Sequence, residues 1–341
     1  MGRGALAQPH LQKFVRSFGL LLPVISLLLL AGCVHGRAPV DAHSERAPLR
    51  IYGMHQTIEL APVHYTAERI YPRDTLVRNG GIPNLFATDD TRADIATHAE
   101  TQALRNSLQH PDLRIILTVA RGHYRMVARR SHGIATLADL RGKRIATMRS
   151  TSAAFHLHNL LRSAGLSEAD VTIVPFNTPR DISRSIISGE ADALAIWEPE
   201  MQIAINALGD DAIEFQPDVG YDELFNLNTT AEALADPARR AQIVRFVAAL
   251  MQGSRHVTAR PEDGIALVAR TTGYPLELVR QAWPHHVFPG AIAPDLLDTL
   301  EREEIWMAQL TGRPARDRAA LASIIDESVA EEARMLLAHR Q

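Results

Sequence analysis

Residues 136–165 read TLADLRGKRIATMRSTSAAFHLHNLLRSAG, and this stretch indicates how the chain folds. The short apolar run within Arg144–Thr147 is typical of a buried strand. Leucines then recur at helical spacing from Leu157 to Leu161, and the pattern ends at Gly165, a common helix C-cap. A strand followed at once by a helix is a βα unit. Repeated βα units predict an α/β fold with a mostly parallel sheet.

Similar strand and helix signals alternate from Leu49 to Phe215. One helix is marked by Thr178-Pro179-Arg180-Asp181, which supplies an N-cap, a proline at the first helical position and an acid in the first turn. After Phe215 the strand signals fade and helices dominate, with Asp236 as the N-cap of the first long one. The other strands are predicted at 115–119, 171–174 and 193–196, and the later helices at about 236–250, 261–271, 275–283, 294–311 and 321–338.

A weak internal repeat points to two related halves. Thr91–Ala96 resembles Gly189–Ala195, and each contains an Ala-Asp pair where a helix pattern gives way to a strand pattern. Residues 49–341 are also too many for one domain, because domains hold about 100–200 residues. We therefore expect two lobes with matching βα units.

The N-terminus has the pattern of an export signal. Basic residues precede an apolar run from Leu20 to Leu30, whereas about 20 apolar residues are needed to span a bilayer. Leu30-Ala31-Gly32-Cys33 follows, and small residues before a cut suit signal processing. The tetrapeptide resembles the bacterial lipobox, which implies a signal peptide over 1–32, lipidation of Cys33 and a lipidated tether over 33–48. The alternative is a plain transmembrane anchor with an incidental Cys33, which the short run and Pro23 disfavour.

Composition and charge narrow the function classes. The chain has 341 residues, a net charge of −3 and a single cysteine, Cys33. A near-neutral charge gives no electrostatic footprint for nucleic acid, and a lipidated Cys33 leaves no thiol for catalysis, metal binding or a disulfide. The histidines do not have metal-site spacing, and the sequence contains no hydrolase, phosphate-loop or dinucleotide motif. We expect no metal, no cofactor and no nucleic-acid partner.

The stretch from about Ala93 to Phe215 resembles the substrate-binding proteins of the aliphatic sulfonate, nitrate, taurine and thiamine-precursor importers. Five pieces in the same order carry the resemblance: Ala93–Thr101, Tyr124–Arg129, Gly133–Ala146, Ser150–Ala153 and Ala191–Pro199. The family fold is that of a two-lobe type II periplasmic binding protein with a ligand cleft between the lobes. The resemblance implies lobe one at 49–128 and 216–341, lobe two at 129–215, and closure of the two lobes around the ligand.

The physical case for a ligand site begins at the end of one predicted strand. Ligands of α/β sheets bind beyond the carboxyl ends of strands, and strand 144–147 ends beside Ser150, Thr151 and Ser152. A helix begins there, and the free N–H groups of a helix N-terminus favour an anion. The alternative is a simple N-cap, which uses only one of the three hydroxyls.

Further ligand-binding residues are expected from both lobes. Trp197 follows strand 193–196, where its ring either lies along a ligand or packs in the core, and Glu198 either accepts hydrogen bonds from the ligand or faces solvent. The resemblance places Ala99, Glu100 and Thr101 in the ligand loop of lobe one, with Ala99 where the family often has glycine. Gln56 and Thr57 follow the first strand and are expected to face the cleft as well.

Together these features predict an extracytoplasmic, lipid-anchored solute-binding component of an ABC importer that captures a small anionic or zwitterionic ligand by lobe closure. The chain is expected to be a monomer and not an enzyme, with the ligand, the importer's permease and ATPase, and the membrane as partners. The resemblance permits the cell membrane or the outer membrane, facing the periplasm in a Gram-negative cell. Two alternatives share the fold: an enzyme similar to pyrimidine-precursor synthases, and a ligand-sensing protein.

Overall fold

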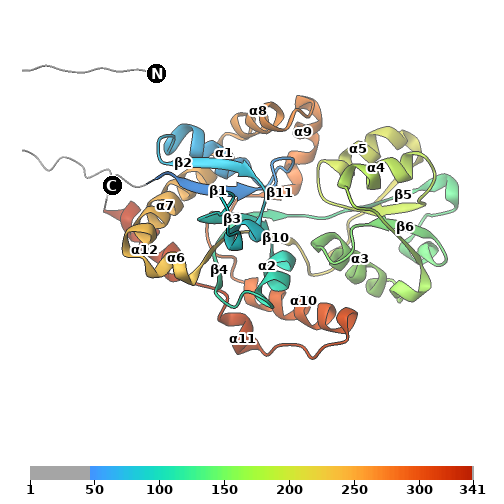
Figure 1. Cartoon of the computed structure of the whole chain (residues 1–341). Helices are drawn as coiled ribbons and strands as arrows, with labels where there is room; N and C mark the ends of the chain where they lie inside the picture. The colour runs from blue at the N-terminus through green and yellow to red at the C-terminus, as the bar shows by residue number, and fades with distance from the viewer. Residues whose placement is uncertain (1–46, 340–341) are drawn as a thin grey trace, which may run out of the picture. The chain divides into compact units, whose positions relative to one another are not determined.

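The computed structural model describes residues 47–339, which Figure 1 shows as two sheets with surrounding helices. The expected signal peptide, the lipidation site Cys33 and the expected tether up to residue 46 lie outside the described residues. We call the part of the chain around the six-stranded sheet the first lobe and the part around the five-stranded sheet the second lobe.

The sheet of the first lobe has the strand order β11-β4-β10-β3-β1-β2. Strands β1, β2 and β3 are parallel, whereas β10 lies antiparallel between β3 and β4, and β11 is antiparallel to β4. Its strands are β1 (Leu49–Gly53), β2 (Thr75–Asn79), β3 (Ile95–Ala99), β4 (Leu113–Gly122), β10 (Glu223–Thr230) and β11 (His286–Val287). The expected α/β fold is confirmed for this lobe, and its sheet is mixed, because β10 and β11 run antiparallel to their neighbours.

The sheet of the second lobe has the order β7-β6-β8-β5-β9. Strands β6, β7 and β8 are parallel, and β5 is antiparallel to both of its neighbours. Its strands are β5 (Met126–Arg129), β6 (Arg144–Thr147), β7 (Thr172–Pro175), β8 (Ala193–Ala195) and β9 (Ala212–Phe215). Residues 126–128 therefore pair in the second sheet, so the lobe boundary expected after residue 128 falls inside β5.

Helices pack on both faces of each sheet, because successive side chains of a strand point to opposite faces. Ile51 of β1 packs in a cluster with α1, α7, α8 and α12, and its neighbour Tyr52 packs in a cluster with α2 and α10. The helices of the first lobe are α1 (Ala61–Tyr65), α2 (Glu100–Ser107), α6 (Ala231–Ala235), α7 (Pro237–Ala259), α8 (Pro261–Thr272), α9 (Leu276–Ala282), α10 (Leu296–Thr311), α11 (Arg318–Ala322) and α12 (Ser328–Ala338).

The second lobe repeats this arrangement with α3 (Ser152–Ser163), α4 (Pro179–Ile187) and α5 (Glu200–Leu208). Leu157 and Leu161 of α3 pack in the same buried cluster as Ile145 of β6, as the leucine spacing predicts. A fully buried leucine contributes about 1.5–3 kcal/mol relative to an exposed one. The Thr178 side chain accepts a hydrogen bond from the Asp181 N–H, which confirms the predicted N-cap of α4.

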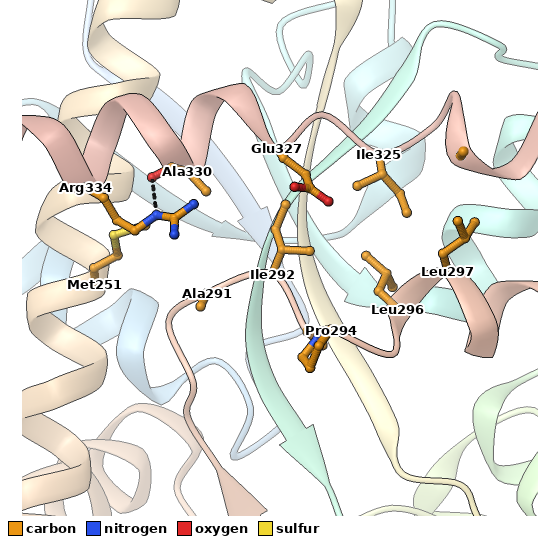
Figure 2. Close-up of a pocket in the computed structure, with 12 residues that line it drawn as sticks. Met251, Ala291, Ile292, Pro294, Leu296, Leu297, Ile325, Glu327, Ala330 and Arg334 are labelled. Atoms are coloured by element: carbon orange, nitrogen blue, oxygen red, sulfur yellow. Dashed lines mark hydrogen bonds between the residues drawn. The ribbon is translucent and has the colours of Figure 1, made fainter. Parts of the chain in front are cut away.

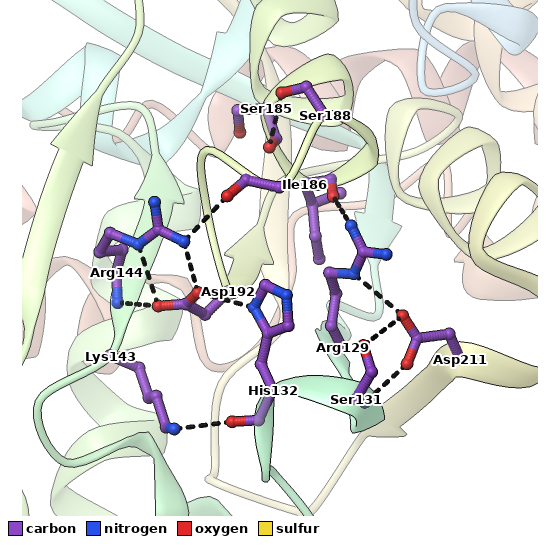
Figure 3. Close-up of polar contacts among 11 residues, drawn as sticks. Arg129, Ser131, His132, Lys143, Arg144, Ser185, Ile186, Ser188, Asp192 and Asp211 are labelled. Carbon is purple, nitrogen blue, oxygen red and sulfur yellow. Dashed lines mark hydrogen bonds and ion pairs between the residues drawn. The ribbon is translucent and has the colours of Figure 1, made fainter.

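The internal Ala-Asp repeat corresponds to the same hydrogen-bond pair in both lobes. The Asp94 N–H donates to the Arg50 carbonyl, and the Arg50 N–H donates to the Asp94 carboxylate at 2.8 Å. Asp192 and Arg144 repeat this pair in the second lobe, with the return bond at 2.7 Å. Figure 3 shows that the Asp192 carboxylate also receives the Arg144 side chain and the His132 ring. Each aspartate thus ties the start of its own strand to the neighbouring parallel strand.

Two predictions about the C-terminal part are wrong. Strand signals were expected to fade after Phe215, but β10 has eight residues and lies in the middle of its sheet, with every residue buried. The expected helix over 321–338 is broken into α11 and α12, because the backbone around Ile325 pairs with Ile115 of β4. The Ile115 N–H donates to the Ile324 carbonyl, so the backbone at Ile324 and Ile325 pairs with the sheet and does not continue a helix.

Candidate functional site

A cavity lies where the two lobes meet at the carboxyl ends of β1, β3, β6 and β8, and we call it the cleft. This is the edge at which α/β sheets bind ligands. About 330 Å³ of space, part of it open to solvent, lies between its walls. It is lined by Met54, Thr57, Glu59, His98, Ala99, Thr101, Gln102, Thr151, Ser152, Trp197, Glu223 and Phe225.

The structure brings six of the ten predicted ligand-binding residues together in this cleft. They come from the loop after β1, the start of α2, the start of α3 and the loop after β8, and they are Thr57, Ala99, Thr101, Thr151, Ser152 and Trp197. Thr101 is fully buried, whereas Trp197 is partly exposed. Gln56, in contrast, is exposed and does not line the cleft.

Glu100 lies beneath the cleft wall rather than in it. Its carboxylate accepts hydrogen bonds from the Tyr221 hydroxyl at 2.5 Å and from the Leu224 N–H at 2.9 Å. Burial raises the pKa of this carboxyl. These contacts hold the first turn of α2 against the start of β10, which is a positioning role in the described structure.

Ser150 and Glu198 also lie beside the cleft. Ser150 has a left-handed backbone with φ of 57°, and its carbonyl accepts a hydrogen bond from the Gln102 side chain of the first lobe. Glu198 is buried and forms an ion pair with Arg125. It also accepts the Gln202 N–H, so its oxygens are occupied by protein groups. A ligand contact for either residue stays a prediction.

The beginning of α3 does not use its hydroxyls as caps. The Thr151 hydroxyl donates to the Met148 carbonyl, and the Ser152 hydroxyl donates to the Glu223 carboxyl of β10 at 2.9 Å. The Tyr124 hydroxyl lies 2.9 Å from the same Ser152 oxygen. The cap-only alternative for this turn is therefore wrong. Ser152 instead links the second lobe to the first, and no side chain caps the N–H groups of the first turn of α3.

Several cleft residues were missed from the sequence, and two of them are acids. Glu59 is 2% exposed and Glu223 is 4% exposed, and both line the cleft. One signal was available for Glu59, because it stands between Ile58 and Leu60 in an apolar run, where a charged residue needs a partner. Glu223 opens β10, a strand that the sequence patterns did not reveal. The other cleft residues that were missed are Met54, His98, Gln102 and Phe225.

The ionisable groups of the cleft are strongly shifted. Burial, with Glu59 and Glu100 nearby, raises the pKa of Glu223 well above its usual range. Burial opposes ionisation of Glu59 too, but His286, with Nε2 3.3 Å from the carboxylate, lowers the pKa of Glu59 overall. Burial lowers the pKa of His98 to about 4, so its ring is neutral at pH 7. The Ala99 N–H donates to Nδ1 of that ring.

A smaller cavity adjoins the cleft, with about 220 Å³ of space that is partly open to solvent. It shares Glu59, Trp197 and Glu223 with the cleft. Its other polar walls are His123, Tyr124, Arg125, Glu198, His285 and His286. Arg125 is held on several sides here, since it binds Glu198, the Gln202 side chain and the Glu214 carboxylate.

Figure 2 shows the residues that line a different hollow in the first lobe. This hollow is larger, with about 1100 Å³ of space that is partly open to solvent. Its walls are mainly aliphatic side chains such as Met251, Ile292, Leu296 and Ile325. Arg334, one of its few charged residues, donates to the Ala330 carbonyl of its own helix. We prefer the cleft as the candidate site, because polar groups from both lobes converge there and binding sites need such groups to orient a ligand.

Two further findings concern the described residues only. Between residues 47 and 339, no three histidine, cysteine, aspartate or glutamate side chains gather closely enough to hold a metal ion. None of the helices in this range combines the length and the apolar character that crossing a bilayer requires.

Comparison with known proteins adds a family and a set of relatives. The family described as NMT1/THI5 like matches residues 81–264, which is more than half of the chain. A protein of Escherichia coli (strain K12) named for binding aliphatic sulfonates is 29% identical over 161 residues. That alignment covers 47% of this chain and 49% of the relative, so the chain matches about half the length of the curated relative.

Solved structures show the same fold at lower identity. The periplasmic aliphatic sulphonate binding protein of Escherichia coli superposes with a TM-score of 0.68 at 19% identity, covering 83% of this chain and 92% of that one. The desulfurization enzyme DSZB superposes with a TM-score of 0.61 at 16% identity, covering 87% of this chain and all (100%) of that one. Binding proteins and an enzyme thus share this architecture, and the two-lobe fold expected from the sequence is confirmed.

Proposed function

Because the chain belongs to the NMT1/THI5-like family, we propose that it is the solute-binding component of an ABC importer, with its ligand in the cleft between the lobes. One observation carries this proposal: the cleft collects Thr101 and Glu223 from the first lobe and Ser152 and Trp197 from the second around one cavity. A ligand that touches both lobes stabilises the closed arrangement over the open one, and differential binding of this kind drives closure.

The proposed ligand is small and anionic or zwitterionic, of the sulfonate, nitrate or taurine kind. The names of the sulfonate-binding relatives support this class. The first turn of α3 supports it as well, because its N–H groups have no side-chain cap and point a helix N-terminus at the cleft.

Hydrogen bonds between the lobes support closure as part of the function. The Ser152 hydroxyl donates to Glu223, and the Gln102 side chain donates to the Ser150 carbonyl. The Tyr274 hydroxyl of the first lobe also donates to Glu200 of the second lobe at 3.1 Å. These bonds can form only when the lobes are together, so we propose that they help hold the ligand-bound state.

The partners and the location belong to the same proposal. We propose that the closed protein docks on a permease with its ATPase, and that Cys33 carries a lipid that anchors the chain outside the cytoplasm. Mass spectrometry of the protein extracted from membranes tests the anchor. The expected result is a chain that starts at a modified Cys33 and that Cys33→Ser leaves unprocessed. An intact N-terminus with an unmodified Cys33 would contradict it.

The enzyme alternative finds less support in the cleft. An activated serine nucleophile needs a neighbouring base, usually a histidine within hydrogen-bond reach. The hydrogen-bond partners of Ser152 are Glu223 and Tyr124 instead, and the pKa of Glu223 is raised by burial. Ser152 is therefore better suited to hold a ligand or a closed state than to attack a substrate.

The proposed function is tested by calorimetric titration after a thermal-shift screen of alkanesulfonates, nitrate, carboxylates and pyrimidines. We expect one class to bind, and we expect Trp197→Ala and Ser152→Ala each to weaken it about tenfold or more. Ser167→Ala is the matched control, because this serine is exposed and caps a short turn in the second lobe. Unchanged affinity in both cleft variants would show that the ligand does not bind in the cleft.

A further inference from the structure

The cleft contains two buried carboxyls and, among residues 47–339, no arginine or lysine in its wall. Glu59 enters from the loop after β1, and Glu223 enters from the start of β10. Both are almost inaccessible to solvent, at 2% and 4% exposure. A wall with two acids and neither arginine nor lysine is not what an anion alone requires, because buried charges need partners of opposite sign.

The basic side chains nearest to these acids are either paired with a carboxylate or neutral. Arg125 lies in the adjoining cavity, but it binds both Glu198 and Glu214. His286 pairs with one oxygen of Glu59. His98 has a pKa lowered by burial to about 4 and so carries no charge at pH 7. Glu223 therefore receives no positive charge from the described protein.

Unpaired polar atoms mark where such a partner is needed. Oε2 of Glu59 and Oε2 of Glu223 are buried and make no hydrogen bond in the described structure. Thr101 is 0% exposed and also lines the cleft, and its hydroxyl oxygen is likewise buried without a hydrogen-bond partner in the described structure. A buried polar atom without a partner costs about 1–3 kcal/mol. The three residues that carry these oxygens all line the cleft, and each of the three oxygens can accept an N–H donor.

The aromatic side chains of the cleft suit the same kind of ligand. Trp197 and Phe225 line the cavity beside the two acids. The face of an aromatic ring attracts a cation within about 6 Å, and tryptophan does so most strongly. An anion gains nothing from such a face.

From these contacts we infer that the ligand presents a protonated amine to Glu59 and Glu223, with Trp197 against it. This inference rests on the proposed function and narrows it, because a sulfonate or carboxylate ligand would then be a zwitterion whose ammonium group reaches the two acids. Any anionic end of the ligand would remain free for the N-terminus of α3.

A rival arrangement has to be separated from this one. Burial raises the pKa of Glu223 and so favours its protonated form in the free protein, and a protonated carboxyl could instead donate to an anion. The ionisable groups that surround Glu223 and Glu59 on all sides are Glu100, Glu303, Tyr124, Tyr221, His98, His123, His285, His286, Arg125 and Glu198. The two arrangements differ in the protonation state of Glu223. A bound ammonium group favours the ionised carboxylate, so Glu223 loses its proton on binding, whereas a bound anion requires the protonated carboxyl.

The test compares three probes by calorimetry: 2-aminoethanesulfonate, ethanesulfonate and ethylamine. They share the two-carbon chain and differ in the amine and the sulfonate. We expect 2-aminoethanesulfonate to bind at least about tenfold more tightly than ethanesulfonate, since a hydrogen bond to a charged group contributes that much. We also expect it to release a proton, measured as a heat that depends on the ionisation enthalpy of the buffer, and to bind more tightly as the pH rises from 5 to 8.

Variants assign the effect to the acids. Glu223→Gln and Glu59→Gln should each weaken the amine-bearing probe about tenfold or more and leave ethanesulfonate unchanged or tighter. Glu190→Gln is the matched control, because Glu190 is exposed and does not line the cleft. Unfolding curves of all three variants show whether the fold is intact. If one cleft variant does not fold, the proton release of the parent protein still decides the question.

Two results would overturn the inference and are distinguishable from a failure of the proposed function. One such result is that ethanesulfonate or another ligand without an amine binds at least as tightly as 2-aminoethanesulfonate, and that the protein takes up or retains a proton on binding. The cleft would then bind anions, and only the assignment of an amine would be wrong. If none of the three probes binds but another amine-free ligand does, the same conclusion holds. If no small molecule binds in the cleft at all, both the proposed function and this inference fall.

Discussion

At the scale of single residues, Asp192 shows how one side chain secures the second lobe. Its carboxylate accepts the Arg144 N–H and the Arg144 side chain, and the His132 ring lies 2.8 Å away (Figure 3). Burial alone would raise the pKa of Asp192, but these hydrogen bonds outweigh it and lower the pKa to about 2. The carboxylate therefore stabilises the fold in its charged form.

Asp192→Asn is expected to lower the free energy of unfolding by about 2 kcal/mol at pH 7, since each pKa unit corresponds to about 1.4 kcal/mol. A group whose folded pKa is depressed contributes its full stability above its unfolded pKa of about 4 and loses it as the pH falls towards 2. The deficit of the variant should thus be constant above about pH 4 and shrink below it. Urea unfolding from pH 7 to pH 3 measures this, with Asp210→Asn at an exposed aspartate as the control. A deficit that does not change below pH 4 would contradict the assignment.

The sequence identified cleft residues where a strand end was recognisable and missed them where it was not. Trp197, Thr151 and Ser152 follow strands that their apolar runs revealed, and all three line the cleft. Glu223 was missed because the strand it opens was missed. Glu100 was predicted from the family resemblance, but nothing in the sequence shows that its carboxylate turns inward to Tyr221.

At the scale of elements, β10 is the largest difference between the elements predicted from the sequence and those in the structure. Its sequence, ELFNLNTT, mixes apolar and polar residues without the continuous apolar run that is typical of a strand buried on both faces. Both asparagines are nevertheless fully buried. Asn226 accepts the Thr118 hydroxyl at 2.9 Å and donates to the Leu224 carbonyl, and Asn228 donates to the Ala96 carbonyl. Side-chain hydrogen bonds thus allow polar residues in a central strand, and the local sequence pattern does not predict these bonds.

Asn226→Ala should therefore destabilise the protein by at least about 2 kcal/mol, because it removes two buried hydrogen bonds and leaves their partners unsatisfied. Denaturant unfolding monitored by circular dichroism gives the value. Asn206→Ala is the matched control: Asn206 also makes two side-chain hydrogen bonds, but it is exposed, and a loss of less than about 0.5 kcal/mol is expected there. If the two variants lost equal amounts of unfolding free energy, the burial of the Asn226 hydrogen bonds would add nothing to stability, which would contradict the prediction.

The helices were the easiest elements to predict, because their caps are local signals. The Asp236 side chain accepts the Ala238 and Arg239 N–H groups at the start of α7, as expected from its position before Pro237. The break between α11 and α12 has no such signal. It follows from the pairing of Ile325 with Ile115, residues more than two hundred positions apart.

At the scale of the whole molecule, the chain makes one excursion into the second sheet and returns. It leaves the first sheet after β4, enters the second at β5, and comes back from β9 to β10. Two connections therefore join the lobes, an arrangement that allows hinge closure about the crossing segments. The predicted lobe boundaries at residues 128 and 215 came from a family resemblance that supplied the order of the elements.

The central claim is that the two lobes close on a ligand held in the cleft, and a distance between spin labels tests it most directly. Labels at Leu76→Cys on β2 and Ile187→Cys on α4 report on the lobes, since both side chains are exposed. Leu76→Cys with Met335→Cys on α12 is the control pair within the first lobe. Replacing Cys33, the only natural cysteine, keeps the labelling specific.

The label distances are measured by pulsed electron paramagnetic resonance without ligand and with a saturating amount of the tightest ligand found by calorimetry. We predict that the distance between the lobes shortens and narrows on binding, while the control pair does not change. The Trp197→Ala variant should remain in the ligand-free distribution at the same ligand concentration. A distance between the lobes that stays the same with saturating ligand would contradict the account.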